Sequence, residues 1–589
     1  MENAPEIKKK IKKEILNGIE TEVAYREMSK PASAEELAAM REKYKEARHG
    51  NMMQFCPPFN PRSYIAHEEG RIICEQDVPV KLRDGVTIYT DIYRPEGATN
   101  IPVIISWSFF GKRPGDGMDD WKIMGVPANT ISKMAKFESA DPGYWCRCGY
   151  AIANVDPRGI GHSEGDLSLF GTQDGRDGYD FCEWVAQQHW CNGRVGFFGN
   201  SCVAMTQYRI AAEQPPHLCA IAPWEATTDM YRESVYEGGI PAKSFPTHIV
   251  TKATGHGYID DMVENMERYP FMGPYWEDKI PRFDKIRVPA YCTASWSHFH
   301  LRGSMMGFRK MRSQRKWLRV HREFEWPDTY CNKYLEELRV FFDRYLKNIN
   351  NGWELTPKIR IEVMDAFDHD YQINRSENEF PLARTQYKKL YLDAANGSLS
   401  QEACATEAKV SYDSQTGLTT FDMAFDEETE LTGYFKLRLW VEADGHDDMD
   451  LFINVQKLST KGEWLPTSVL GEPHPGAWGK MRVSRRKLDE KLSTDYQPVQ
   501  AHTVDEKLQP GEIVPVDIEI NPTSKIWHKG QQIRVQIAGR YIREGWFEPI
   551  GWIPDNKGNH IIHAGGKYDS YLQIPVIPPK YQDGDYIYR

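Results

Sequence analysis

The sequence predicts two kinds of domain in one chain: an α/β domain built on a mostly parallel sheet, followed by an all-β domain. Three observations support this prediction. The chain has 589 residues, more than one hydrophobic core usually organises. From about residue 72 to residue 350, short apolar runs alternate with segments of helical periodicity. From residue 357 onward, short β-type runs follow one another and helical periodicity is nearly absent.

The α/β prediction depends on how the elements alternate along the chain. The predicted strands are short, bounded by Asp-Gly, Pro or Gly, and cover residues 78–82, 87–93, 102–107, 150–154, 194–198, 290–294 and 317–320. The predicted helices have apolar residues at helical spacing and cover residues 175–188, 202–214 and 334–346. Such alternation indicates a doubly wound, mostly parallel sheet. We therefore assign residues 56–225 and 288–350 to this α/β domain.

Three other segments complete the predicted organisation. Residues 1–55 are rich in Lys, Glu, Ala and Met at helical spacing, which predicts a helical extension at the N-terminus and makes self-association an expectation. Residues 226–287 are rich in Met, Tyr and Pro and favour an inserted cap. Residues 357–589 hold β-type runs at 358–363, 388–392, 433–441, 450–456, 514–520 and 532–538, typical of a β-sandwich or jelly roll.

Composition excludes several classes of protein. The net charge of −11 and the pI near 5.9 argue against a nucleic-acid partner, which needs a basic face. Apolar runs are too short to span a membrane, and the N-terminal lysines are not followed by the apolar core of a signal peptide. Eleven scattered cysteines without a Cys-x-x-Cys pair indicate reduced thiols rather than zinc ligands. We therefore expect a cytoplasmic protein without a membrane partner.

A serine at a strand-to-helix turn is the first candidate catalytic residue. The predicted strand 194–198 runs into Gly199, Asn200, Ser201 and Cys202, where a helix begins. A tight turn of this kind exposes a nucleophilic hydroxyl, and the amide of Cys202 at the helix N-terminus can bind an oxyanion. The strict Gly-x-Ser-x-Gly pattern is not met, because the second glycine is replaced by alanine at one residue's offset. The alternative is a serine that only caps the helix.

Several motifs in fixed order resemble those of one enzyme family. They are Asp156–Gly165 (DPRGIGHSEG), Glu183–Gly193 (EWVAQQHWCNG), the Gly-Asn-Ser-Cys turn, Leu431–Trp440 (LTGYFKLRLW) and Gly565–Pro575 (GGKYDSYLQIP). Together they are similar to the CocE/NonD hydrolases, a family that includes cocaine esterase, X-Pro dipeptidyl-peptidases and α-amino-acid ester hydrolases. The resemblance covers roughly residues 70–589. It implies an α/β-hydrolase core with an inserted helical cap and a C-terminal jelly roll.

The general base and its orienting acid are assigned from strand ends and from this resemblance. His321 follows the predicted strand 317–320, where the family's catalytic histidine falls, although a lone histidine can also serve packing. The family places its acid in a Gly-Trp-x-Asp turn, and the matching residue is His298, which brings no negative charge. Either His298 has a modified role, or an acid from the loop after the last strand replaces it: Glu323, Glu325 or Asp328.

The residue expected to complete the oxyanion hole differs from that of the family. The family uses a tyrosine hydroxyl as second donor, and the resemblance places Phe110, which has no donor, at that position. Four further aromatic residues flank the expected pocket segments: Trp107, Trp224, Tyr231 and Trp296. They are candidates for contacts with an acyl or ring substituent, and core packing is an equal alternative.

These residues predict a serine hydrolase that cleaves a small-molecule ester or amide through an acyl-enzyme. His298, His300 and His321 could together be a metal site, but no cysteine or acid stands at metal spacing. We therefore expect no metal and no cofactor. Two alternatives stay open. One is acyl transfer or cyclisation with the same acyl-enzyme. The other is a binding protein that has kept the fold, which His298 and Phe110 favour.

Overall fold

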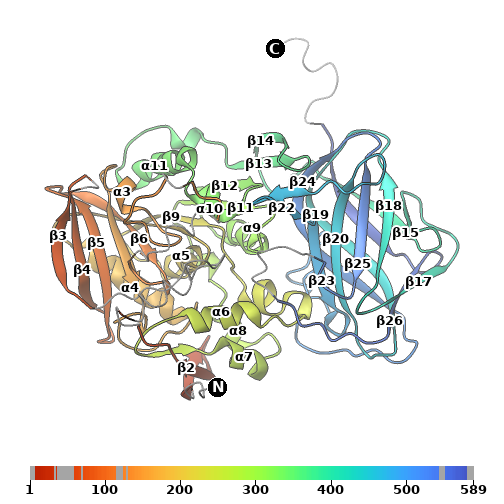
Figure 1. Cartoon of the computed structure of the whole chain (residues 1–589), viewed down its shortest axis with the longest axis horizontal. Helices are drawn as coiled ribbons and strands as arrows, with labels where there is room; N and C mark the ends of the chain where they lie inside the picture. The colour runs from red at the N-terminus through yellow and green to blue at the C-terminus, as the bar shows by residue number, and fades with distance from the viewer. Residues whose placement is uncertain are drawn as a thin grey trace, which may run out of the picture. The chain divides into compact units, whose positions relative to one another are not determined.

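The computed structural model describes residues 7–31, 35, 59–67, 70–113, 124–127, 130–542 and 551–579. The chain divides into two compact units, visible in Figure 1. The first contains the described residues up to Glu233 together with 245–318 and 323–356. The second contains residues 234–244, 319–322 and the described residues from Pro357 onward. Each unit has its own hydrophobic core.

The first unit is built on a mixed sheet whose central strands are parallel. In spatial order its strands are β3 (Arg62–Ala66), β4 (Ile72–Lys81), β5 (Thr87–Pro95), β7 (Ala151–Asp156), β6 (Ile101–Trp107), β8 (Cys191–Asn200), β9 (Leu218–Trp224) and β11 (Ala290–Ser295). The strands from β7 to β11 pair in parallel, whereas β5 is antiparallel to both of its neighbours. β12 (Lys316–His321) follows in the chain. The predicted α/β alternation is confirmed.

Helices connect these strands. They are α3 (Pro142–Trp145), α4 (Thr172–Ala186), α5 (Cys202–Ala212), α9 (Leu301–Lys310), α10 (Glu325–Thr329) and α11 (Asn332–Leu346), with a short 3₁₀ turn η5 (Trp353–Leu355). Every residue of α5 is buried, because this helix packs between the sheet and α4. The core beneath β9 is rich in aromatic side chains from β8, β9, β11 and α11. This packing holds the turn between β8 and α5 rigidly.

The prediction of an N-terminal helical extension is wrong for the part of it that the structure describes from residue 7 to residue 31. These residues form an antiparallel hairpin of β1 (Lys9–Leu16) and β2 (Ile19–Glu27), and β2 pairs with β10 (Tyr258–Asp260). Asn17 and Gly18 form its turn with φ of 50° and 84°. Asn-Gly is the strongest short hairpin signal, and it outweighs the helical spacing of the apolar residues. Of residues 32–58, all but Glu35 lie outside the described residues.

The predicted inserted segment, residues 226–287, is only partly helical. It contains a π-helix η2 (Tyr231–Val235), 3₁₀ turns η3 (Glu237–Gly239) and η4 (Phe283–Lys285), the helices α6 (Ser244–Lys252), α7 (Met262–Arg268) and α8 (Pro274–Glu277), and the strand β10. Asp261 caps α7 by accepting a hydrogen bond from the backbone N–H of Glu264. The segment therefore interrupts the strand–helix alternation between β9 and β11, as the sequence indicates.

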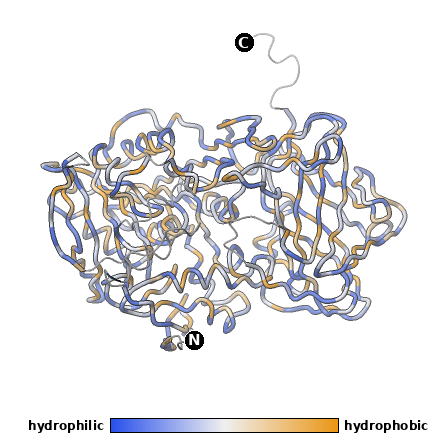
Figure 2. Tube along the Cα trace, in the orientation of Figure 1, coloured by the Kyte–Doolittle hydropathy of each residue, from blue (hydrophilic) through white to orange (hydrophobic). Residues whose placement is uncertain are grey.

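The second unit consists of strands that pair mostly antiparallel. Their bounds are β13 (Ile359–Met364), β14 (Asp370–Glu377), β15 (Gln386–Asp393), β16 (Ser398–Ser400), β17 (Ala408–Asp413), β18 (Leu418–Ala424), β19 (Thr429–Asp444), β20 (Asp450–Leu458), β21 (Thr467–Val469), β22 (Glu472–His474), β23 (Ala477–Arg482), β24 (Val514–Trp527), β25 (Gln532–Ala538), β26 (Asn559–Ala564) and β27 (Tyr571–Ile577), with one 3₁₀ turn η6 (Val483–Arg485). The pairing is parallel between β13 and β24 and between β16 and β18. Buried and partly exposed residues alternate along the second half of β19 and along β25. Figure 2 colours the chain by hydropathy and shows hydrophilic and hydrophobic stretches interspersed in this unit. The strand-rich character of this part is confirmed.

Two sequence-based expectations concern the chain as a whole. No helix among the described residues is long and apolar enough to cross a membrane. The ten cysteines in the described part of the chain are all free thiols, as their scattered spacing indicates.

Candidate active site

Ser201 lies on a strained turn between the end of β8 and the start of α5. Its backbone has φ 53° and ψ −125°, a conformation that side-chain-bearing residues rarely adopt. The turn is held by the Ser201 backbone N–H, which donates to the carbonyl of Glu225 at 2.9 Å. The Ser201 side chain makes no capping hydrogen bond to the helix, so the alternative of a helix-capping serine is wrong. This is the conformation of a nucleophile elbow.

Gly199 is the residue that lets this turn form. Its φ is 154°, and a Cβ atom there would lie 2.3 Å from Cγ1 of Val203 and 2.6 Å from the carbonyl oxygen of Glu138. Residues 138 and 139 run beside the turn, because Ser139 and Gly199 form an antiparallel bridge. A side chain at position 199 would therefore push apart the strand, the helix and this loop.

The substitution Gly199→Ala should lower the free energy of unfolding by about 2–4 kcal/mol, because steric overlap adds to backbone strain. Gly193→Ala is the matched control. Gly193 also has a positive φ of 77°, but the nearest atom to its added Cβ would be 3.7 Å away. The control should cost only about 1 kcal/mol. Urea denaturation of the two variants measures the difference, and equal losses would contradict the steric argument.

His300 is the histidine beside the Ser201 hydroxyl. Its Nε2 atom lies 3.2 Å from Ser201 Oγ, and its Nδ1 atom lies 2.7 Å from Thr227 Oγ1. When Nδ1–H donates to Thr227, the lone pair of Nε2 faces the serine hydroxyl. Burial, and after it the neighbouring His298, lowers the pKa of His300 well below its ordinary value. The imidazole is therefore neutral near pH 7 and able to accept the proton of Ser201.

The structure places His300, rather than the predicted His321, against the nucleophile. His321 ends β12 and is buried, in the segment 319–322 that groups with the second unit. His300 stands at the N-terminus of α9, in the loop that follows β11. The sequence predicts the base at the end of the last strand of the sheet. The imidazole beside Ser201 instead comes from the loop after β11, where the sequence suggests His300 only as a metal ligand.

A second histidine and a carboxylate complete the group. The backbone N–H of His300 donates to Nδ1 of His298 at 3.1 Å, and Nε2 of His298 lies 3.3 Å from Oε1 of Glu325. The other carboxylate oxygen of Glu325 accepts from Nδ2 of Asn200 at 2.9 Å. Of the three acids that the sequence left open, Glu325 is thus the one that lies at the histidines. His298 has a modified role, since it links this acid to the loop that carries His300.

The same three side chains could be considered as a metal site. One ligand atom from each of His298, His300 and Glu325 can be chosen so that all three lie within 4.8 Å of one another. However, both ring nitrogens of His300 have hydroxyl partners, and Nδ1 of His298 already accepts a hydrogen bond. The His298 ring also lies between two carboxyl groups, because its Nδ1 is 3.5 Å from Oε2 of Glu225 and its Nε2 is 3.3 Å from Oε1 of Glu325. This hydrogen-bonding pattern fits a proton-transfer site and does not fit the lone-pair requirement of a metal.

The charge state of Glu325 follows from its surroundings. Burial raises the pKa of its carboxyl to about 7, while His300 and the Asn200 amide act in the opposite direction. Because a carboxylate oxygen lies within 4.8 Å of a ring nitrogen of His300, it stabilises the imidazolium that forms when His300 takes a proton. The site therefore brings together a serine hydroxyl, a neutral imidazole and a carboxyl group that ionises near neutral pH.

The opposite side of the nucleophile turn offers a hydrogen-bond donor. Cys202 is the first residue of α5, and the first N–H groups of a helix have no partner within the helix. Phe110, at the place of the family's second donor, packs its ring against Phe137 with ring centroids 5.2 Å apart. Phe137 in turn contacts Trp326. An aromatic surface therefore occupies the position where the resemblance predicts a hydroxyl.

Comparison with known proteins decides the family. Residues 84–258 match the X-Pro dipeptidyl-peptidase (S15 family) model, and residues 351–573 match the X-Pro dipeptidyl-peptidase C-terminal non-catalytic domain. The crystal structure of a CocE/NonD family hydrolase from Staphylococcus aureus is 35% identical, with a TM-score of 0.82 over 86% of this chain and 94% of that one. The chain belongs to the CocE/NonD hydrolase family.

Two more distant proteins are also similar to this chain. The cocaine esterase of Rhodococcus sp. (strain MB1 Bresler) is 25% identical over 412 residues, which are 58% of this chain and 68% of that protein. The crystal structure of an aminopeptidase from the marine sediment archaeon Thaumarchaeota archaeon has a TM-score of 0.64 at 14% identity, covering 89% of this chain and 99% of that one. At this identity the second likeness shows the fold alone.

Four aromatic residues predicted to contact substrate are instead buried in the core of this CocE/NonD hydrolase. Trp107, Trp224 and Tyr231 have no exposed surface, and Trp296 is 2% exposed. The Trp107 indole donates to Asp174 at 2.7 Å, and the Tyr231 hydroxyl donates to the carbonyl of Pro270 at 2.8 Å. This burial agrees with the packing alternative, and His300 beside Ser201 is buried to the same degree. Phe110 is the partly exposed member of the predicted set.

Three residues at the nucleophile were not found from the sequence: Glu138, Thr227 and, as a base, His300. Glu138 and Thr227 lie in loops without a recognisable motif. The only local signal was the His-x-His pair, whose spacing also fits a metal site. Their proximity to Ser201 arises from the order of the strands, which no local pattern encodes.

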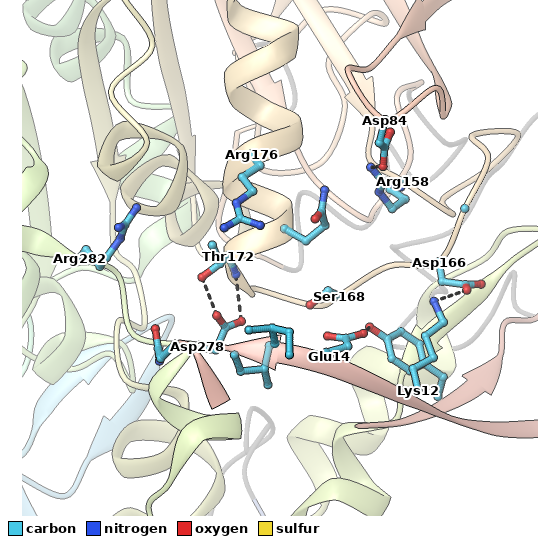
Figure 3. Close-up of a pocket in the computed structure, with 17 residues that line it drawn as sticks. Lys12, Glu14, Asp84, Arg158, Asp166, Ser168, Thr172, Arg176, Asp278 and Arg282 are labelled. Atoms are coloured by element: carbon cyan, nitrogen blue, oxygen red, sulfur yellow. Dashed lines mark hydrogen bonds and ion pairs between the residues drawn. The ribbon is translucent and has the colours of Figure 1, made fainter. Parts of the chain in front are cut away.

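A cavity of about 680 Å³ lies beside the β1–β2 turn, and none of its lining residues belongs to the group at Ser201. Figure 3 shows two ion pairs in its lining, Lys12 with Asp166 and Arg158 with Asp84. Asp278 accepts hydrogen bonds from the backbone and hydroxyl of Thr172 at the start of α4. Of these contacts, the pair of Lys12 and Asp166 joins the hairpin to the segment before α4, and we assign the cavity no catalytic role.

Proposed function

We propose that this protein hydrolyses a carboxylic ester, or an amide, through an acyl-enzyme on Ser201. The observation that supports the proposal most strongly is the 3.2 Å separation of Ser201 Oγ and His300 Nε2 at a strained strand-to-helix turn. A serine hydroxyl is a poor nucleophile near neutral pH and needs an adjacent base. Neutral His300 supplies that base, and Thr227 holds its ring in the required tautomer.

The proposed reaction proceeds in two balanced steps. Ser201 Oγ adds to the substrate carbonyl carbon while its proton moves to Nε2 of His300, and the carbonyl oxygen becomes an oxyanion near the Cys202 N–H. Collapse of this intermediate expels the alcohol or amine, which takes the proton from His300. Water then attacks the acyl-enzyme and gives its proton to His300. The bond between the acyl carbon and Ser201 Oγ breaks, the acid leaves, and His300 returns the proton to Ser201 Oγ. The Glu325 carboxylate lowers the energy of the imidazolium in both steps.

The chemical class of substrate is inferred from relatives. The names cocaine esterase and X-Pro dipeptidyl-peptidase denote an ester and a peptide substrate, both of which present an acyl carbon to a nucleophile. We propose a small-molecule acyl compound, with esters first because their leaving group needs less protonation than an amine. No observation in the described residues favours acyl transfer, cyclisation or a purely binding role. We also propose that residues 226–287 form the family's cap and that the strands from β13 to β27 form its jelly roll.

A fluorophosphonate probe tests this function directly. Wild type should incorporate one equivalent of probe and hydrolyse p-nitrophenyl butyrate, whereas Ser201→Ala should do neither. Ser313→Ala is the matched control, because Ser313 is a buried serine in the loop between α9 and β12. Ser313→Ala should incorporate the probe and hydrolyse p-nitrophenyl butyrate like wild type. Turnover by Ser201→Ala at the wild-type rate would refute the proposal, and so would a wild type that neither labels nor turns over.

A further inference from the structure

The oxyanion side of the nucleophile has one donor where this chemistry ordinarily uses two. The Cys202 N–H is available at the start of α5, but Phe110 brings no hydroxyl. Losing one such donor costs an acyl-transfer enzyme about 10²–10³ in kcat. The residues next to the turn therefore have to be searched for a second group that can donate a hydrogen bond.

Glu138 is a buried acid at this turn. Its side chain is 2% exposed, and its backbone carbonyl accepts the N–H of Asn200 at 3.3 Å, so residue 138 is anchored to the strand that presents the nucleophile. One carboxyl oxygen, Oε1, accepts the indole N–H of Trp326 at 3.1 Å. The other, Oε2, is buried without a hydrogen-bond partner among the described residues. A buried polar atom without a partner is costly, which points to a partner supplied during function.

The surroundings of Glu138 place its carboxyl at the nucleophile and at the helix start. Burial, and after it the Glu138 carboxyl, raises the pKa of the Cys202 thiol. The Ser201 hydroxyl is likewise among the groups that interact with the Glu138 carboxyl. Glu138 therefore lies next to the turn that carries Ser201 and Cys202, since Asn200 donates to its backbone carbonyl and Ser139 bridges to Gly199. An anionic carboxylate there would repel an oxyanion, whereas a protonated carboxyl would donate to it.

Burial and a neighbouring carboxyl favour the protonated form of Glu138, while Trp326, Ser201 and Lys136 act in the opposite direction. Burial, and after it the nearby Glu325 carboxyl, raises the pKa of Glu138 well above its ordinary value. Since two close carboxylates do not both ionise readily, the pair takes its first negative charge on Glu325, whose pKa is raised only to about 7. A carboxylic acid held neutral in an apolar site is an effective hydrogen-bond donor.

We propose that Glu138 is a catalytic residue that donates a hydrogen bond from its protonated carboxyl to the oxyanion, in place of the absent hydroxyl at position 110. The inference rests on the proposed function. When Ser201 Oγ bonds to the carbonyl carbon, the π electrons move to the carbonyl oxygen, which then accepts from the Cys202 N–H and from Oε2–H of Glu138. The serine proton goes to His300 and then to the leaving group. Glu138 keeps its own proton throughout.

The test compares two variants of similar size. Glu138→Gln keeps a neutral donor, whereas Glu138→Met removes the donor and fills the same space. We expect Glu138→Met to lower kcat for p-nitrophenyl acetate about 100-fold and to weaken inhibition by phenylboronic acid, which forms a tetrahedral serine adduct, by a similar factor. KM should stay unchanged. Glu138→Gln should keep kcat within about tenfold of wild type. Thermal unfolding checks that both variants fold.

Trp326→Phe gives an independent measurement should Glu138→Met fail to fold. This change keeps a ring but removes the N–H that holds Oε1, so kcat and boronate affinity should fall together by about fivefold to tenfold. Equal losses in Glu138→Gln and Glu138→Met, or unchanged boronate affinity in Glu138→Met and Trp326→Phe, would overturn the role of Glu138. In those cases wild type still labels at Ser201. Failure of the proposed function itself would appear in wild type, as absence of both labelling and turnover.

Discussion

Replacing His300 with glutamine should lower kcat for p-nitrophenyl esters by about 10⁴–10⁶-fold, the range seen when a serine hydrolase loses its base. Glutamine preserves much of the shape and can still contact Thr227, so the loss reflects proton transfer rather than packing. Because Nε2 of His300 is the ring nitrogen 3.2 Å from Ser201 Oγ, no proton acceptor remains at that position in the variant. Steady-state kinetics and the rate of fluorophosphonate labelling should fall together.

His321→Gln is the informative counterpart of this variant. His321 is also buried, so both substitutions place an amide where an imidazole was. We expect His321→Gln to keep kcat within about tenfold of wild type, since a packing change acts only indirectly on the serine. Circular dichroism and thermal unfolding serve as fold checks for both. A larger loss in His321→Gln than in His300→Gln would restore the assignment made from strand order.

The second large effect is expected for Glu325→Gln. A carboxylate oxygen of Glu325 lies within 4.8 Å of a ring nitrogen of His300. At that distance the attraction between the carboxylate and the imidazolium is about 3 kcal/mol at an effective dielectric constant of about 20. Removing the negative charge should therefore lower kcat by about 10²–10³-fold. The amide keeps the size of the side chain and can still bond to Asn200. Wild-type kcat/KM should rise with pH through about 7 as Glu325 ionises, and this dependence should vanish in the variant.

Glu325 should also make stability depend on pH in a direction opposite to its effect on activity. Burial raises the folded-state pKa of this carboxyl to about 7 from an ordinary value of 4.5, so the folded protein binds its proton more tightly than the unfolded chain. This contribution to stability is fully present below the unfolded-state pKa and is lost as pH rises through 7. Urea denaturation should therefore find Glu325→Gln more stable than wild type at pH 8 and no longer so at pH 4.5.

Activity and stability measured together distinguish the loss of the Glu325 charge from a structural defect in Glu325→Gln. The groups that face Glu325 are His298, His300, Asn200 and Glu138, and each keeps its own chemistry in the variant. A variant that lost activity together with stability at pH 8 would indicate a structural role instead. An unchanged pH profile would show that another group titrates near neutrality. A gain in stability with a loss of activity is typical of an active site that holds an unfavourable charge.

Much of the fold could be predicted from local patterns. The strands of the α/β unit and the helices α4, α5 and α11 follow from periodicity and turn residues, because burial on one face imposes a period on the sequence. The N-terminal hairpin shows the limit of this argument. Its apolar residues fit a helical spacing as well as alternation, and only the Asn17–Gly18 turn distinguishes the two.

The candidate site likewise combines features that the sequence encodes locally with features that only the tertiary structure produces. The sequence alone determined the family, the candidate nucleophile Ser201 and its strand–turn–helix setting, because each is encoded by contiguous residues. Only the tertiary structure decided that His300 is the histidine at the hydroxyl, that Glu325 supplies the charge and that Glu138 lies beside the turn. These side chains come from three loops brought together by the order of strands in one sheet. Distances between such loops depend on packing across the whole domain, which no local pattern records.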